Sequence, residues 1–159
     1  MPAMRTAAIF SLLVSTTPGL CVTAGAADEA SPSPDSCFYD VQTLETTIEI
    51  FKDRGDLAGA MKRAAAVAED ATSCEKSQRP VNKRPMNLAA AESYAKAGDL
   101  AIGLGQPAEA VKFLTLSNQY FELVLSDPQT GSDEKMADRA QMSVNNDKLA
   151  RIAAASASP

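Results

Sequence analysis

Histidine is absent from this chain of 159 residues, and tryptophan is absent as well. Without histidine the chain lacks the commonest general base and metal ligand at neutral pH. This excludes Ser–His and Cys–His nucleophile pairs, and imidazole-ligated zinc, copper or haem. A phosphate-binding loop is also missing, because residues 103–110 (GLGQPAEA) lack the Lys–Ser/Thr pair of a P-loop. We therefore expect a protein that is not an enzyme and that holds no cofactor and no metal.

Carboxylates are the remaining candidates for acid–base chemistry. Glu69 and Asp70 are adjacent in one predicted helix, and Asp133 and Glu134 in another. Both pairs are expected to be solvated rather than to converge on a cleft. Residues 127–134 (DPQTGSDE) lack the alternating acids and the terminal glutamate of a calcium-binding loop, so a turn with a helix cap is expected there. A carboxylate enzyme is kept only as a minor alternative.

Long apolar runs are also lacking, which excludes a transmembrane helix of roughly 20 residues. Residues 1–26 have the features of a signal peptide: Arg5, the apolar run Ala7–Val14 and the small residues Ala24–Ala26. We predict cleavage after this segment and a periplasmic or secreted protein. A buried N-terminal helix and a lipidated Cys21 are the alternatives.

Positive charge is scarce relative to negative charge. The chain has 15 Lys and Arg against 20 Asp and Glu, and loss of Arg5 with the signal leaves 14 against 20, a net charge of −6. Such a balance gives no electrostatic basis for binding nucleic acid or anionic lipid. The locally basic run Lys76–Arg84 lies among prolines and is interpreted as a solvated loop. We expect no nucleic acid partner and no membrane span.

Alanine is abundant, and apolar residues recur at helical spacing along most of the chain, with no stretch typical of a strand. We predict a flexible linker at residues 27–36, a single all-α domain at residues 37–155 and a disordered tail at residues 156–159. A polar loop over residues 74–85 separates the second predicted helix from the third. The five predicted helices cover about residues 38–54, 56–73, 86–104, 107–126 and 133–155.

The stretch RGDLAGAMK at residues 54–62 has an echo in LGQPAEAVK at residues 104–112. Each copy lies in a predicted turn between two helices, where glycine allows the left-handed backbone that closes a helix. The small alanine that follows permits two helices to cross closely. The corresponding positions are Gly55 with Gly105 and Ala60 with Ala110. The echo predicts one helical hairpin used twice, giving two stacked antiparallel hairpins and a C-terminal capping helix.

Around the second copy, Tyr94, Gly98, Gly105 and Ala110 follow a spacing that resembles the tetratricopeptide repeat. The resemblance covers roughly residues 40–128 and implies a degenerate array with elongated helices. The interval here is fifty residues, whereas that family repeats at about 34. The family's peptide-groove residues do not map onto matching positions. A plain helical bundle with similar turns is the alternative.

Cysteine is scarce, and only Cys37 and Cys74 remain after loss of the signal. Two cysteines in an exported domain most simply form a disulfide. Cys37 lies just before the first predicted helix and Cys74 just after the second, and these ends are neighbours in an antiparallel pair. The bond would add about 3–4 kcal/mol in the chain-entropy model. A redox-active pair is the weaker alternative, because no C-x-x-C motif is present.

The fourth predicted helix is apolar over most of its circumference. One stripe consists of Leu114, Phe121 and Leu125, and a second consists of Phe113, Leu116, Tyr120 and Leu123. Either the first hairpin covers the second stripe, or part of it stays exposed as a partner-binding surface. The residues expected on the inner side of the fifth helix are Met136, Ala140, Val144, Leu149 and Ile152.

These expectations favour an exported helical-repeat adaptor that binds an unidentified protein or peptide partner. A second hypothesis comes from another class of protein. It is a disulfide-stapled helical bundle that binds a small apolar ligand or acts as a secreted inhibitor.

Overall fold

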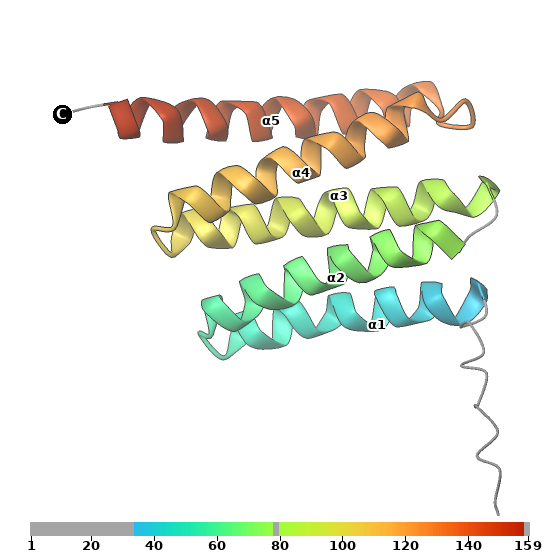
Figure 1. Cartoon of the computed structure of the whole chain (residues 1–159), viewed down its shortest axis with the longest axis horizontal. Helices are drawn as coiled ribbons and strands as arrows, with labels where there is room; N and C mark the ends of the chain where they lie inside the picture. The colour runs from blue at the N-terminus through green and yellow to red at the C-terminus, as the bar shows by residue number, and fades with distance from the viewer. Residues whose placement is uncertain (1–33, 78–79, 158–159) are drawn as a thin grey trace, which may run out of the picture. The chain divides into compact units, whose positions relative to one another are not determined.

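The computed structural model describes residues 34–77 and 80–157, with the backbone alone for residues 34–40, 42, 77 and 80–82. These residues are almost entirely helical, and none of them is in a strand (Figure 1). The all-α prediction is therefore confirmed. The predicted signal peptide and most of the predicted linker lie outside the described residues. The helices are α1 (Pro34–Asp53), α2 (Leu57–Ser77), α3 (Pro80–Gly103), α4 (Pro107–Ser126) and α5 (Ser132–Ala157).

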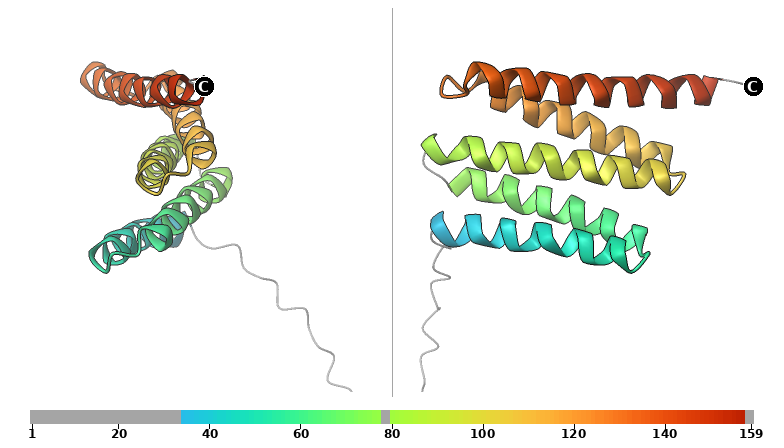
Figure 2. Two further views of the ribbon diagram at one scale, coloured as in Figure 1. Left: turned by 90° about the vertical axis from the view of Figure 1, so that its left-hand side faces the viewer. Right: turned by 180° about the vertical axis from the view of Figure 1, so that it is seen from behind.

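Each helix packs mainly against the helices that precede and follow it in the chain. The α2–α3 contact is as extensive as the α3–α4 contact, whereas α1 touches α3 only slightly. Figure 2 shows the helices following one another in chain order from α1 to α5. This is the stacking predicted for two consecutive hairpins and a last helix. Within the described residues, no helix is both long enough and apolar enough to cross a membrane.

The turns after α1 and α3 have the same backbone hydrogen bonds fifty residues apart. Gly55 and Gly105 have positive φ angles of 75° and 67°. In each turn the glycine N–H and the next N–H donate back into the preceding helix at 2.9–3.0 Å. The donor–acceptor pairs are Gly55–Lys52 and Asp56–Phe51, then Gly105–Ile102 and Gln106–Ala101. This pair of backbone hydrogen bonds is the Schellman motif. The prediction that the two turns have the same structure is therefore confirmed.

Small residues bring the helices together. Ala60 and Ala110, the paired alanines of the echo, are both fully buried. A Cβ atom at Gly98 would lie 2.7 Å from the Leu114 Cδ2 atom, so glycine is what allows α4 to approach α3 here. Tyr94 on α3 stacks on two aromatic rings of α4, at centroid distances of 6.3 and 5.7 Å.

The predicted loop between the second and third helices is wrong. Helix α2 continues to Ser77 and α3 begins at Pro80, so only residues 78–79 separate them. Pro80 occupies the first helical position, where a missing N–H costs no hydrogen bond, and Pro85 follows near the start of the helix. The basic run is accordingly helical over most of its length, and Lys83 forms an ion pair of 3.1 Å with Glu75. Sequence reasoning had treated both prolines as helix breakers.

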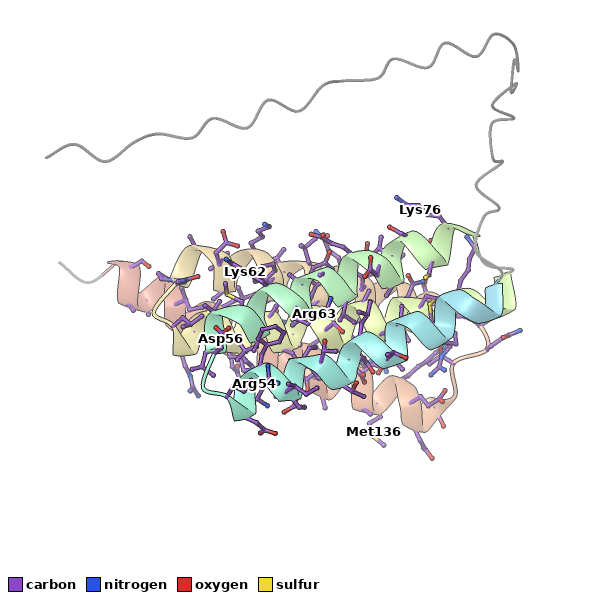
Figure 3. All side chains as sticks on the ribbon, turned by 90° about the horizontal axis from the view of Figure 1, so that it is seen from below. Arg54, Asp56, Lys62, Arg63, Lys76 and Met136 are labelled. Carbon is purple, nitrogen blue, oxygen red and sulfur yellow. The ribbon has the colours of Figure 1, made fainter. Side chains whose placement is uncertain are left out.

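The predicted inner face of α5 is wrong at three of its five positions, and only Leu149 and Ile152 are partly covered. Met136 and Val144 are 66% and 45% exposed, and Ala140 is exposed as well. Met136 points away from the neighbouring helices (Figure 3). The buried residues of α5 are Asp138 and Asn145, and Leu149 and Ile152 are half-buried. The contact face of α5 is therefore mostly polar, which a search for apolar periodicity cannot find.

Candidate functional site

Two clefts open along one side of the helical stack, and we call this side the odd-helix face because α1, α3 and α5 border it. The larger cleft, of about 480 Å³, is lined mainly by α3 and α5. The smaller, of about 220 Å³, lies between α1 and α3. The larger is lined by Glu92, Ala95, Lys96, Asp99, Phe121, Ala137, Asp138 and Gln141. The smaller is lined by Ile48, Glu49, Lys52, Lys96, Asp99 and Leu100.

A row of charged residues on α3 joins the two clefts. Glu92, Lys96 and Asp99 are spaced four and three residues apart, so they lie on one face of the helix. Lys96 and Asp99 line both clefts. The spacing was visible in the sequence, but a charged helical face is most often simply solvated. Only the packing of α1 and α5 on either side of α3 makes this row the centre of a groove.

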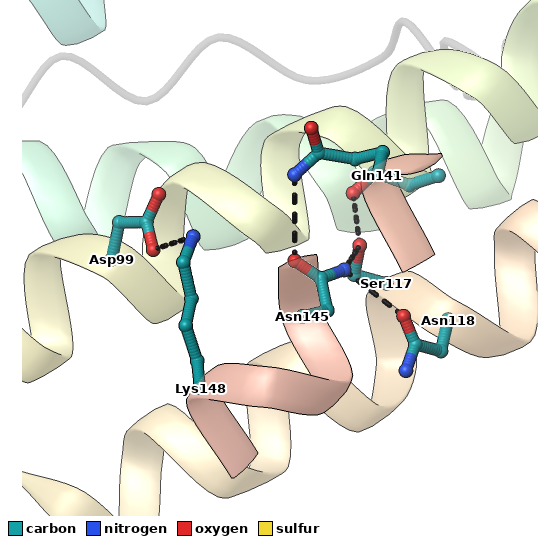
Figure 4. A network of polar contacts seen from close by, with 7 residues as sticks. Asp99, Ser117, Asn118, Gln141, Asn145 and Lys148 are labelled. Carbon is teal, nitrogen blue, oxygen red and sulfur yellow. Dashed lines mark hydrogen bonds and ion pairs between the residues drawn. The ribbon is translucent and has the colours of Figure 1, made fainter. Parts of the chain in front are cut away.

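Polar contacts hold α5 over the larger cleft (Figure 4). The Asn145 Nδ2 atom donates to Ser117 Oγ and to Asn118 Oδ1, both at 3.0 Å. Ser117 Oγ in turn donates to the Ala91 carbonyl at 2.8 Å, which links α5 to α4 and α3. At the end of the cleft, Lys148 Nζ forms an ion pair of 2.5 Å with Asp99. These bonds fix α5 along its axis as well as against its neighbours.

The first turn of α5 is held by a second set of polar contacts. Arg84 on α3 forms an ion pair of 2.9 Å with Glu134 and donates through Nε to Thr130 Oγ1 at 3.1 Å. Thr130 is buried and its hydroxyl donates to the Val124 carbonyl at 2.7 Å. The turn between α4 and α5 is thus tied to the start of α3.

Two carboxyl groups of the larger cleft have perturbed acidities. Burial raises the pKa of Asp138 above its ordinary value, Arg84 opposes this, and Glu134 adds to it. Burial also raises the pKa of Glu92; Lys96 lowers it, while Glu45 and Asp138 raise it. In both groups burial, rather than neighbouring charge, is the main cause of the raised pKa.

The predicted partner-binding residues do not form one surface. Phe113 is buried and stacks on Tyr94, and it also lines a cleft of about 550 Å³ between α2 and α4. Tyr120 is half-buried and its hydroxyl accepts a hydrogen bond of 3.0 Å from Thr72. Leu116 is half-buried against the core, whereas Leu123 is 51% exposed. The role of these four residues in binding stays a prediction.

The cysteines do not flank the first hairpin as predicted. Cys37 lies within α1 and Cys74 within α2, because both helices are longer than the sequence indicated. Cys74 is buried. The side chain of Cys37 lies outside the described residues, so the Cys37–Cys74 disulfide stays a prediction.

Comparison with known proteins adds no family. No protein-family model matches the chain, and neither curated proteins nor solved structures give a match. The resemblance to tetratricopeptide repeats stays a prediction. Sequence reasoning missed the site residues Glu92, Lys96, Asp99 and Asp138. Asp138 gave no signal, because the apolar residues of its helix pointed to a different face.

Proposed function

We propose that the protein is an exported adaptor that binds a protein or peptide partner along the odd-helix face. The observation that carries the proposal is the continuity of the groove, since Lys96 and Asp99 line both of its clefts. An extended segment can lie across α1, α3 and α5 and meet both clefts. The groove alternates acidic, basic and apolar side chains, which suits a segment with both polar and apolar groups.

A degenerate tetratricopeptide-like array is the architecture that we propose for this adaptor. Three features support it: the repeated turn, the close approach at Gly98, and contacts mainly between helices consecutive in the chain. In helical-repeat proteins, stacking of hairpins creates an extended surface that binds partners. The proposal includes export through the segment at residues 1–26 and a Cys37–Cys74 disulfide between α1 and α2.

The alternative of a small apolar ligand has less support. Each of the three clefts is lined by charged side chains, including Lys96 in two of them and Lys112 in the third. Pockets for small apolar ligands have mostly apolar walls and few polar groups. The described clefts therefore favour a polar, extended ligand.

Charge reversal on each face tests the proposal. A partner is first captured from a native extract by cross-linking, identified by mass spectrometry and purified, and its dissociation constant is then measured by calorimetry. Lys96→Glu should change the dissociation constant by about tenfold or more, because the residue lies at the centre of the groove, and an increase in affinity is expected if a cationic group of the partner enters the larger cleft. Lys62→Glu is the matched control, since Lys62 lines the cleft between α2 and α4.

The reverse result, with a change in affinity in Lys62→Glu and none in Lys96→Glu, would place the partner on the other side of the stack. If neither variant changes the affinity, the odd-helix face is not the binding surface. Thermal unfolding of both variants distinguishes loss of binding from loss of folding.

A further inference from the structure

The cleft between α3 and α5 contains a carboxylate oxygen that the fold buries without a partner. Asp138 is 8% exposed, and its Oδ2 atom has no hydrogen-bond partner among the residues that the structure describes. Native proteins rarely leave such an oxygen unpaired, because its lost hydration is not offset. Asp138 also lines the cleft, so a rotation of its side chain would bring the carboxylate to a donor on a ligand there.

The neighbouring cations do not satisfy this group. Arg84 is paired with Glu134 at 2.9 Å, and Lys148 with Asp99 at 2.5 Å. Lys96 lines the cleft and lies close enough to Glu92 to lower its pKa. The lining therefore contains three carboxylates and a single lysine. The pKa values of Asp138 and Glu92 are raised mainly by burial, and Arg84 and Lys96 respectively oppose the shifts.

The size and walls of the cleft indicate what kind of cation fits. Its volume of about 480 Å³ is far larger than a bare ion needs and lies in the usual range of ligand pockets, roughly 300–1,000 Å³. Among the side chains that the structure describes, no three Cys, Asp or Glu groups converge as metal ligands would. Ala95, Ala137 and Phe121 add apolar walls beside the carboxylates. Lysine and arginine combine an apolar stem with a charged head, and this matches such a cleft.

We propose that this cleft binds the ammonium or guanidinium group of a lysine or arginine side chain in the partner, with Asp138 and Glu92 as the hydrogen-bond acceptors. The inference rests on the proposed function, because it names the chemistry of the segment that would occupy the odd-helix face. The stem of the side chain lies against Ala95 and Ala137. The Asp138 side chain turns toward the charged head, which donates to the oxygen that lacks a partner among the described residues.

Two peptides of nearly identical shape test the inference on the full exported protein. One is acetyl-Ala-Ala-Arg-Ala-Ala-amide, and the other has citrulline, a neutral isostere, in place of arginine. Each is titrated into isotopically labelled protein and followed through the backbone amide signals. The arginine peptide should shift the signals of Ala137 and Asp138. The citrulline peptide should bind at least about tenfold more weakly, because charge-assisted hydrogen bonds are the stronger ones.

Variants of the cleft sharpen the result. Asp138→Asn and Glu92→Gln should each weaken binding of the arginine peptide by about tenfold. Asp70→Asn on α2 is the matched control, because Asp70 is exposed and lines none of the three described clefts. Thermal unfolding shows whether each variant is folded. If Asp138→Asn does not fold, Glu92→Gln decides.

Equal affinity for the two peptides would overturn the inference. It would also be overturned if the arginine peptide did not shift the backbone amide signals of Ala137 and Asp138. Calcium or magnesium chloride that shifts the same signals at lower concentration would also overturn it, in favour of a metal site. The adaptor function fails separately, through an unchanged affinity in Lys96→Glu. A partner whose affinity responds to Lys96→Glu but not to Asp138→Asn would leave the function standing and overturn this inference alone.

Discussion

The contacts among α1 to α4 and the contacts of α5 are built from different chemistry. Among the described side chains, the buried apolar cluster comes entirely from α1 to α4, and α5 adds only the half-buried Ile152 at its edge. The buried residues of α5 are instead an aspartate and an asparagine. Apolar burial is strong and non-directional, whereas a buried amide is satisfied in few arrangements. We expect the first four helices to supply most of the stability, and α5 to be placed accurately but held weakly.

The largest effect on the free energy of unfolding is expected in the buried apolar core of α1 to α4. Leu114 is fully buried, so Leu114→Ala should lower the free energy of unfolding by about 2–5 kcal/mol. Urea unfolding followed by circular dichroism measures this. Leu123→Ala, on the exposed side of α4, is the control and should stay within about 0.5 kcal/mol of the wild type. Equal losses in the two variants would contradict the assignment of the core.

Gly98 offers a second check of the same contact. Gly98→Ala alone should destabilise the protein, because its Cβ would approach the Leu114 side chain to 2.7 Å. The same substitution in the Leu114→Ala background should cost less, because the clashing atoms are gone. Additive losses would show that the two residues do not meet.

An intermediate effect is expected where α5 docks. Asn145→Ala removes the donor to Ser117 and Asn118 and should cost about 1–3 kcal/mol. Because α5 can open separately, the loss should appear as faster hydrogen exchange in α5 with little change in α2 and α3. Ser143→Ala, at an exposed position of the same helix, is the control. Uniformly faster exchange over all helices would mean that α5 and the core unfold as one unit.

A smaller effect is expected in the pH dependence of the free energy of unfolding, and its sign follows from the raised pKa of Asp138. The folded state holds this proton more tightly than the unfolded state, whose pKa is near the ordinary value of 3.8. The stabilising contribution of Asp138 to the free energy of unfolding is therefore fully present below that pH. It is lost as the pH rises through the pKa that Asp138 has in the folded state. The charged groups that act on it are Arg84 and Glu134, and Asp138 in turn raises the pKa of Glu92.

The difference in stability between the wild type and Asp138→Asn at each pH isolates the contribution of Asp138 from that of the other carboxylates. We expect the stability of the wild type relative to Asp138→Asn to fall as the pH is raised from about 3 to 7, measured by thermal unfolding. A relative stability that rises over this range would show that the pKa of Asp138 is lowered in the folded protein.

The smallest effect is expected on the outer side of α5. Met136→Lys should change the free energy of unfolding by less than about 0.5 kcal/mol, because the side chain is 66% exposed. Ile152→Lys should cost more, because Ile152 packs against the core. If Met136→Lys proved the more damaging of the two, the helix would be rotated relative to the described structure.

The two parts of the molecule also differ in how far the sequence predicts them. The presence of α1 to α4 follows from alanine content and apolar spacing, and the turns after α1 and α3 follow from Gly55 and Gly105, because each feature acts locally. The boundary between α2 and α3 does not follow in this way. The helical character of α5 was predicted, but its orientation was not. Met136 and Val144 have the apolar spacing of an inner face, yet the surface that α5 meets on α4 presents Ser117 and Asn118. Pairing between polar side chains on different helices has no local signature.

The candidate site was missed for a related reason. Glu92, Lys96 and Asp99 are an ordinary charged face until α1 and α5 are placed beside them. Pro80 and Pro85 led to a predicted loop where the structure has a helix, since the effect of a proline depends on its position within a helix. Tertiary placement, rather than propensity, decides both cases.

Asn145 also bears on which helices can occupy the place of α5 on α4. A stack of similar hairpins has an end onto which the first helix of another copy could add, and repetition of that contact would produce filaments. An apolar helix placed on α4 in the position of α5 would bury Ser117 and leave the Asn118 amide oxygen without the donor that Asn145 provides. Because such unsatisfied groups are costly, the amide disfavours replacement of α5 by an apolar helix of another copy.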